Sequence, residues 1–201
     1  MNTNIPIVLF AYKRYRNLTN LIKIVEAYKT KNVFIFCDGN KSHDDFEDCK
    51  KTQAVALGAS SKYNFKVIIR HSNIGLNQNI LFGIDYVLSI HEYAIFLEDD
   101  ILPTNNFIDF IYKAENKFRN SPNIFSISGF HSYDPSIIDY ELFYSPRFFC
   151  WGWLTWSRKW KTIKDNVLNM ASSYDHYWQI PCDIGDDLIY AHRAYKLGRK
   201  S

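Results

Sequence analysis

Short apolar segments alternate with stretches of helical spacing along the first two thirds of the chain, and this alternation constrains the fold more than any other feature. Most of the apolar segments, such as IPIVLFAY at 5–12, carry an apolar side chain at nearly every position. Continuous apolar runs of this length are typical of strands that are buried on both faces of a parallel sheet. We therefore expect strands at 5–12, 32–37, 65–69, 93–97 and 123–128.

The stretches between these strands predict helices, because their apolar residues recur every three or four positions. Alternation of strand and helix indicates βαβ units, and so an α/β fold with a mixed, mainly parallel sheet. After residue 130 the pattern loosens into aromatic loops and short elements. We expect helices to begin at Asn17, near Ser42, at Asn73 and at Pro103–Thr104, with Asn17 and Asn73 as caps, and a last helix at about 186–197.

The composition indicates one folded domain. Of the 201 residues, 47% are hydrophobic and 22% are charged, which argues against disorder for most of the chain. The formal net charge is only +3 and is evenly spread, so we expect no nucleic-acid partner. The basic group Lys13, Arg14 and Arg16 is local, and it could meet a phosphate or face solvent.

No zinc motif and no membrane span can be recognised. The cysteines at 37, 49, 150 and 182 lack the spacing of zinc ligands, and we expect reduced, buried thiols. The first residues do not resemble a signal peptide, and no run reaches the ~20 apolar residues that cross a bilayer. We expect a cytoplasmic protein without a transmembrane segment, and contact with the inner face of the cell membrane stays open.

Three consecutive acids, Glu98, Asp99 and Asp100, follow the fourth predicted strand. Adjacent carboxylates repel one another unless a cation compensates them. Oxygen ligands of this kind suit Mg²⁺ or Mn²⁺, which usually hold one or two carboxylates together with substrate phosphates. A plainer alternative is a solvated loop whose acids interact with the dipole of the following helix. We favour the metal, because ligands of parallel sheets bind at the carboxyl ends of the strands.

Two other strand ends carry polar residues. Asp38 ends the second strand, where it could accept hydrogen bonds from a base or ribose or could simply form an Asp-Gly turn. His71 follows the third strand, and a single histidine is more often structural than catalytic. Gly75 would let the backbone approach a ligand, and the helix that follows could face an anion with its first amides.

The last third of the chain offers an aromatic segment and an acidic one. The segment FFCWGWLTW at 148–156 could stack on sugars or bases, or it could fill the core. Asp183, Asp186 and Asp187 precede the last predicted helix. One of these carboxylates could act as a general base, although N-terminal capping of the helix explains the same residues.

Taken together, these segments resemble the GT-A fold glycosyltransferases, particularly the group around N-acetylglucosaminyltransferase I and bacterial family 2-like sugar transferases. The resemblance implies a Rossmann-like three-layer sandwich. An EDD triplet followed by an aromatic-Gly-Trp-Leu turn and then by an acidic helix start is its most specific part. The matching segments are IPIVLFAYKR, FCDG, RHSNIGLNQ, FLEDDILPTNNFIDF, FFCWGWLTW and GDDLIYAHR.

The resemblance also implies roles for individual residues. The ligands would be a nucleotide-sugar donor, Mn²⁺ or Mg²⁺, and a glycan or glycoconjugate acceptor, as in polysaccharide biosynthesis. Members of the family usually invert the anomeric centre in one displacement and commonly use UDP-sugars. By this resemblance, the nucleobase would be held by Arg14 and Asp38, and the donor would also be contacted by His71, Glu98 and Asp99. The metal ligand would be Asp100, and the residues beneath the sugar would be Trp151, Gly152 and Trp153. The general base that takes the proton from the acceptor would be Asp187, or else Asp186.

We expect one domain over 1–201, with a nucleotide-sugar-binding part at 1–129 and an acceptor-side part at 130–201 that the family usually continues further. Two alternatives stay open. A sugar-phosphate nucleotidyltransferase needs a glycine-rich loop after the first strand, and the segment 12–16 contains no glycine. A non-catalytic nucleotide- or carbohydrate-binding domain would also use the same acidic pocket.

Overall fold

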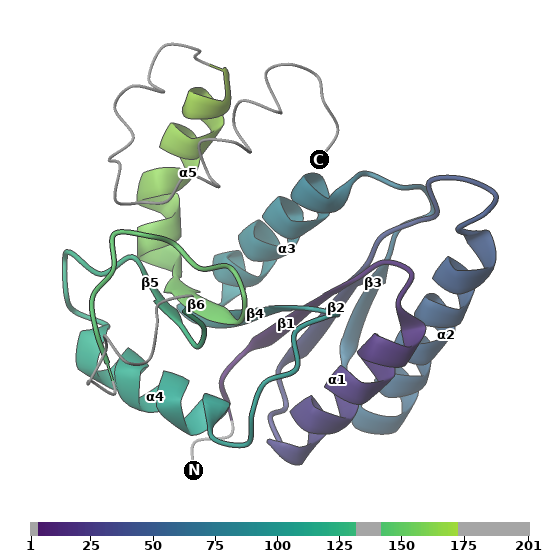
Figure 1. Cartoon of the computed structure of the whole chain (residues 1–201), viewed down its shortest axis with the longest axis horizontal. Coiled ribbons are helices and arrows are strands. Elements are labelled where there is room, and N and C mark those ends of the chain that lie inside the picture. The colour runs from purple at the N-terminus through teal and green to yellow at the C-terminus, as the bar shows by residue number, and fades with distance from the viewer. Residues whose placement is uncertain (1–3, 132–141, 173–201) are drawn as a thin grey trace.

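The computed structural model describes residues 4–131 and 142–172 and shows a six-stranded sheet between two layers of helices (Figure 1). The strands are β1 (Ile7–Ala11), β2 (Val33–Cys37), β3 (Lys66–Ile69), β4 (Tyr93–Glu98), β5 (Ser126–Ser128) and β6 (Trp153–Trp156). They lie in the order β3-β2-β1-β4-β6-β5. β6 runs antiparallel to its two neighbours, and the other five strands run parallel to one another.

Helices cover both faces of the sheet and bury its central strands (Figure 1). The helices are α1 (Tyr15–Ala27), α2 (Phe46–Tyr63), α3 (Leu76–Ile90), α4 (Phe107–Phe118) and α5 (Ser157–Ser172). Residues of α1, α2 and α4 share one apolar cluster with the sheet, and residues of α3 and α5 share the other. None of these described helices combines the length and apolar character needed to cross a bilayer. The expected α/β sandwich on a mixed, mainly parallel sheet is therefore confirmed, and it is consistent with a GT-A-like fold.

The five strands that we predicted are all present, and most are shorter than their apolar runs. We predicted neither β6 nor α5, because the sequence pattern loosens after residue 130 and we expected aromatic loops and short elements there. Trp153, Leu154 and Trp156 are in fact buried in β6. This strand is inserted between β4 and β5, so its pairing partners lie far away in the sequence and leave no local signal.

The predicted helix starts are wrong by two or more residues. α1 begins at Tyr15, and Arg14 rather than Asn17 occupies the N-cap position. Gly75 precedes α3, with a φ of 88° that favours glycine, while the Asn73 amide bonds to another loop. α4 begins at Phe107, three residues after Thr104. Before α3, a contact between loops therefore replaces the local cap that we expected from Asn73.

Replacement of Gly83 by alanine tests how tightly α3 packs on the sheet. A Cβ at Gly83 would lie 2.9 Å from Cζ of Phe10, and closer still to Cε1 of the same ring. Phe10 is buried, so the ring cannot move aside without disturbing the core. We expect Gly83→Ala to lower the free energy of unfolding by about 1–3 kcal/mol in urea denaturation.

Gly58→Ala is the matched control, because Gly58 also lies inside a helix and no atom would meet its Cβ within 4 Å. Alanine should raise the stability there by about 0.5–1 kcal/mol through helix propensity. Equal effects of the two substitutions would contradict the close packing of α3 on β1.

Candidate active site at the carboxyl edge of the sheet

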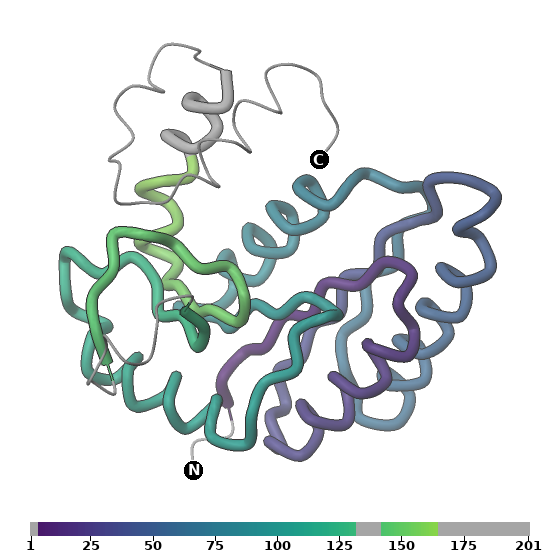
Figure 2. The backbone as a smooth tube through the Cα atoms, in the orientation of Figure 1, coloured from purple at the N-terminus to yellow at the C-terminus, as the bar shows by residue number. Residues whose placement is uncertain are grey.

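The ends of the five parallel strands and the beginning of β6 meet at one edge of the sheet. Phe10 of β1 pairs with Glu98 of β4, and Phe96 of β4 pairs with Trp153 of β6. The turn that follows β4 therefore lies beside the loop that follows β1 (Figure 2). Because these loops share one edge, residues that are more than eighty positions apart in the sequence become neighbours.

Arg14 joins the acids that follow β4. Its Nη1 donates hydrogen bonds to Oδ1 of Asp99 at 2.9 Å and to Oδ2 of Asp100 at 2.7 Å. The backbone N–H of Tyr12 reaches Oδ2 of Asp99 at 3.4 Å. The side chain of Asp99 is only 6% exposed, whereas that of Asp100 is 48% exposed. Asp99 is thus an anchored acid, and Asp100 presents its carboxylate to solvent.

The negative charge of the triplet is only partly compensated. Burial, followed by the charges of Asp100 and Asp99, raises the pKa of Glu98 above its usual range. Burial also raises the pKa of Asp99, and the hydrogen bond from Arg14 opposes this effect. Burial, and then the charge of Glu98, raises the pKa of the Cys150 thiol, which places the loop before β6 close to the acids. One arginine therefore faces three carboxylates.

A pocket of about 490 Å³ opens beside this turn. Asp100 lines it together with residues 101–104, which connect β4 to α4. Trp151 and Phe130 also line it, with their rings in an edge-to-face contact at 4.5 Å between centroids. Gly152 has a φ of 74° and also lines the pocket. The structure thus brings the predicted metal ligand and two of the predicted sugar-binding residues to one pocket.

Trp153 lies elsewhere. Its ring packs against Phe96 at 4.9 Å and against Phe148 at 4.7 Å between centroids, and its side chain is buried in the core between the sheet and α3. The turn at Gly152 separates the exposed Trp151 from the buried Trp153. The role of Trp153 beneath the donor sugar stays a prediction, and its burial indicates a structural contribution.

The carboxylate of Asp38 accepts hydrogen bonds from the protein itself. Its Oδ1 accepts the backbone N–H groups of Gly39 at 2.9 Å and Ile74 at 3.0 Å. Its Oδ2 accepts the amide of Asn73 at 2.9 Å and the N–H of Gly75 at 3.1 Å. A carboxylate accepts about four hydrogen bonds, so these donors fill it. A nucleotide base would have to displace one of them, and the donor-binding role of Asp38 stays a prediction.

The other predicted residues do not join this cluster in the described part of the chain. His71 is exposed in the loop after β3, next to Ser72, whose carbonyl oxygen would lie 2.7 Å from a Cβ at Gly39. This close approach fixes the loop against the end of β2. Asp186 and Asp187 lie outside the described residues, so the catalytic base stays a prediction.

Sequence reasoning missed a contact between the loops after β1 and β2. The hydroxyl of Tyr12 donates to Asp45 at 2.8 Å and accepts the backbone N–H of Lys41 at 3.1 Å. Lys13 forms an ion pair with the same Asp45. Burial, followed by the hydrogen bond to Asp45, raises the pKa of Tyr12 to about 12, so its hydroxyl remains a donor at neutral pH. No spacing rule predicts a pair 33 residues apart.

The residues at this edge fit a divalent cation only when a ligand completes the site. Among the described residues, no three His, Cys, Asp or Glu side chains converge on a point that could hold a metal by themselves. Mg²⁺ and Mn²⁺ commonly take one or two carboxylates and fill the remaining positions with phosphate oxygens and water. Asp100, whose exposed carboxylate lines a pocket, matches that requirement.

Comparisons with known proteins give a structural similarity and no family. No protein-family model matches the chain, and no curated protein matches it in sequence. The glycosyltransferase GlyE of Streptococcus pneumoniae TIGR4 is similar with a TM-score of 0.48 and 11% identity over 94% of this chain. Its apo form gives 0.47 and 12% over 95%. The chain spans 43% of the length of each. At TM-scores this low, the similarity assigns neither a family nor an activity to this chain.

Glu98→Gln tests the uncompensated charge through the pH dependence of stability. A carboxyl group whose pKa is raised in the folded state stabilises fully below its unfolded pKa of about 4.3, and this contribution is lost as the pH rises through the folded pKa. Glutamine keeps the neutral form at every pH. The variant should therefore match the wild type near pH 4 and have a higher Tm than the wild type at pH 7.

Glu92→Gln serves as the control, because Glu92 is exposed at the opposite end of β4. Its Tm should follow that of the wild type across the same pH range. A lower Tm of Glu98→Gln at pH 7 would show that the ionised Glu98 is compensated, contrary to the site described here.

Proposed function

We propose that the chain is a metal-dependent, inverting glycosyltransferase, which moves a sugar from a nucleotide diphosphate donor, with a UDP-sugar favoured, to a hydroxyl of a glycan or glycoconjugate. The observation that carries the proposal is the exposed carboxylate of Asp100 in a pocket that Trp151 also lines. Such a carboxylate can hold Mn²⁺ or Mg²⁺ against a diphosphate, and a tryptophan ring offers an apolar face to a sugar. Both residues lie where parallel sheets bind their ligands.

In this proposal Asp100 would hold the cation, and Glu98 and Asp99 would lie on the donor side. A bound divalent cation offsets the negative charge that grows on the departing diphosphate. Arg14 supplies a second positive group at the same edge, through a guanidinium that pairs well with phosphate oxygens. The chain then needs only to hold the sugar beside Trp151 and to leave its far face open to the acceptor.

A carboxylate at the acceptor side would take the proton from the attacking hydroxyl. Asp187 is our first candidate and Asp186 the second, on the strength of the family resemblance alone. One well-placed base contributes about 10²–10⁴-fold to such a reaction. Because attack and departure occur in a single displacement on opposite faces of the sugar, the configuration of the anomeric carbon is inverted.

The segment after β1 argues against a nucleotidyltransferase. Only Tyr12, Lys13 and Arg14 separate β1 from α1, and their contacts with Asp45 and Asp99 fix all three. A loop that wraps a triphosphate needs free backbone amides and more chain than this. A pure binding module is separated from an enzyme by hydrolysis of the donor in the absence of acceptor, which a binder should not catalyse.

Asp100→Ala tests the metal assignment without knowledge of the sugar. In the wild type, UDP at about 100 times its Kd should raise the Tm by roughly 5–10 °C in the presence of Mn²⁺, because ligands of the native state stabilise it by ~2.7 kcal/mol at that excess. The shift should be much smaller without Mn²⁺. We expect Asp100→Ala to abolish the part of the shift that depends on Mn²⁺.

Asp48→Ala is the matched control, since Asp48 is 52% exposed on α2 and its removal changes the net charge equally. This variant should keep the full response to UDP and Mn²⁺. An Asp100→Ala protein that responds to UDP and Mn²⁺ like the wild type would rule out Asp100 as the metal ligand.

Asp187→Asn tests the base. It should bind UDP and Mn²⁺ normally in the thermal-shift assay and lose about 10²–10⁴-fold in the rate of sugar release from the donor, because asparagine cannot accept the proton. Water serves as the acceptor in this measurement. If Asp186→Asn shows the loss and Asp187→Asn does not, the base is Asp186.

A further inference from the structure

Arg14 is the one cationic side chain that pairs with the triplet 98–100 in the part of the chain that the structure describes. A single nitrogen, Nη1, makes both contacts, with Asp99 at 2.9 Å and with Asp100 at 2.7 Å. Its neighbour Lys13 is committed to Asp45. Arg14 therefore supplies the positive charge that a metal ion would otherwise supply at Asp100.

The two ion pairs of Arg14, with Asp99 and with Asp100, differ in their exposure to solvent. Asp99 is nearly buried, and the backbone N–H of Tyr12 also binds it. The side chains of Arg14 and Asp100 are 55% and 48% exposed. Exposed ion pairs contribute little net stability. The contact between Arg14 and Asp100 can therefore open at low cost while Asp99 stays in place.

A divalent cation and a guanidinium compete for Asp100. Both would approach the same carboxylate, and their positive charges repel one another across a few ångströms. A diphosphate changes this balance, because it offers the guanidinium two oxygens in a geometry that arginine recognises well. The donor thus provides Arg14 with a new partner at the moment when the cation needs Asp100.

We propose that Arg14 occupies the place of the cation at Asp100 until a nucleoside diphosphate arrives, so that metal and nucleotide bind cooperatively. The inference rests on the proposed role of Asp100 as metal ligand and adds the residue that controls access to it. Mn²⁺ alone binds weakly, because it must displace Arg14 from Asp100 while no phosphate is present to bind the guanidinium. By linkage, each ligand raises the affinity for the other by the same factor.

Titration of Mn²⁺ alone, followed by the paramagnetic resonance signal of free Mn²⁺, tests the inference. Arg14→Gln should bind Mn²⁺ about tenfold or more tighter than the wild type, within the 5–150-fold range that is usual for coupled sites. Lys13→Gln removes the same charge one residue away, from a side chain that pairs with Asp45. This control should bind Mn²⁺ like the wild type.

Two results would overturn the inference. One is an Arg14→Gln protein whose affinity for Mn²⁺ equals or falls below that of the wild type. The other is a gain in Lys13→Gln as large as that in Arg14→Gln, which would indicate a general effect of net charge. In either case, loss of the Mn²⁺-dependent response to UDP in Asp100→Ala would still uphold the metal site. Retention of that response would instead defeat the proposed function.

Arg14→Gln leaves the buried Asp99 without its cationic partner, which destabilises the fold. If the single variant does not fold, Asp99→Asn combined with Arg14→Gln is compared with Asp99→Asn alone. The neutral amide removes the buried unpaired charge from both proteins. The double variant should again bind Mn²⁺ about tenfold tighter than its reference, and equal affinities would overturn the inference.

Discussion

The parallel pairing of β1 with β2 and β4 is the constraint on which the site depends. Ala11 pairs with Cys37, and Phe10 pairs with Glu98, so the chain leaves all three strands at the same level of the sheet. β1 and β2 are buried at every position. A slip by one residue would turn their apolar side chains from one helical layer to the other and disrupt the close packing of both layers. The core therefore fixes the distance between Arg14 and the acids after β4, and the site inherits its geometry from packing.

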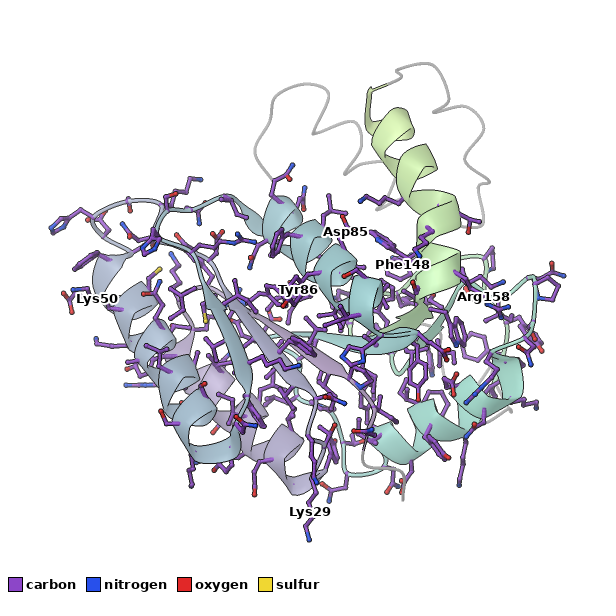
Figure 3. All side chains as sticks on the ribbon, turned by 180° about the vertical axis from the view of Figure 1, so that it is seen from behind. Lys29, Lys50, Asp85, Tyr86, Phe148 and Arg158 are labelled. Carbon is purple, nitrogen blue, oxygen red and sulfur yellow. The ribbon has the colours of Figure 1, made fainter. Side chains whose placement is uncertain are left out.

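Acidic side chains in this fold serve two purposes, which their hydrogen bonds distinguish. Asp38 is filled by donors of the loop before α3, and the buried Glu115 accepts the indole N–H of Trp156 at 3.0 Å. Asp85, labelled in Figure 3, lies on the side of α3 that faces α5, whose Trp160 binds it at 2.6 Å. These three carboxylates fasten loops and helices to the sheet or to one another. Asp100 differs, because its contact with Arg14 is exposed to solvent and can be exchanged for a ligand.

The sequence predicts the parts of this fold that follow from local pattern, and it fails where partners are distant. Apolar runs located five strands, and the acids after β4 indicated the pocket where Asp100 and Trp151 now lie. β6 escaped prediction, because aromatic residues that fill a core and those that stack on a ligand look alike in sequence. Asp38 shows the same limit in the site: a strand-end aspartate suggests a ligand, and only the fold reveals that Asn73 and three backbone amides already occupy it.

Charge balance would oppose the binding of a nucleotide diphosphate alone at this edge of the sheet. Three carboxylates already face one guanidinium, and burial, followed by the charges of Asp100 and Asp99, raises the pKa of Glu98. A diphosphate would bring additional negative charge to the same few ångströms. If it took Arg14 without replacement, Asp99 and Asp100 would lose their only cationic partner among the described residues. A divalent cation that binds together with the anion would restore the balance. In the proposed function, the exposed bond between Arg14 and Asp100 would therefore couple binding of the donor to binding of the metal.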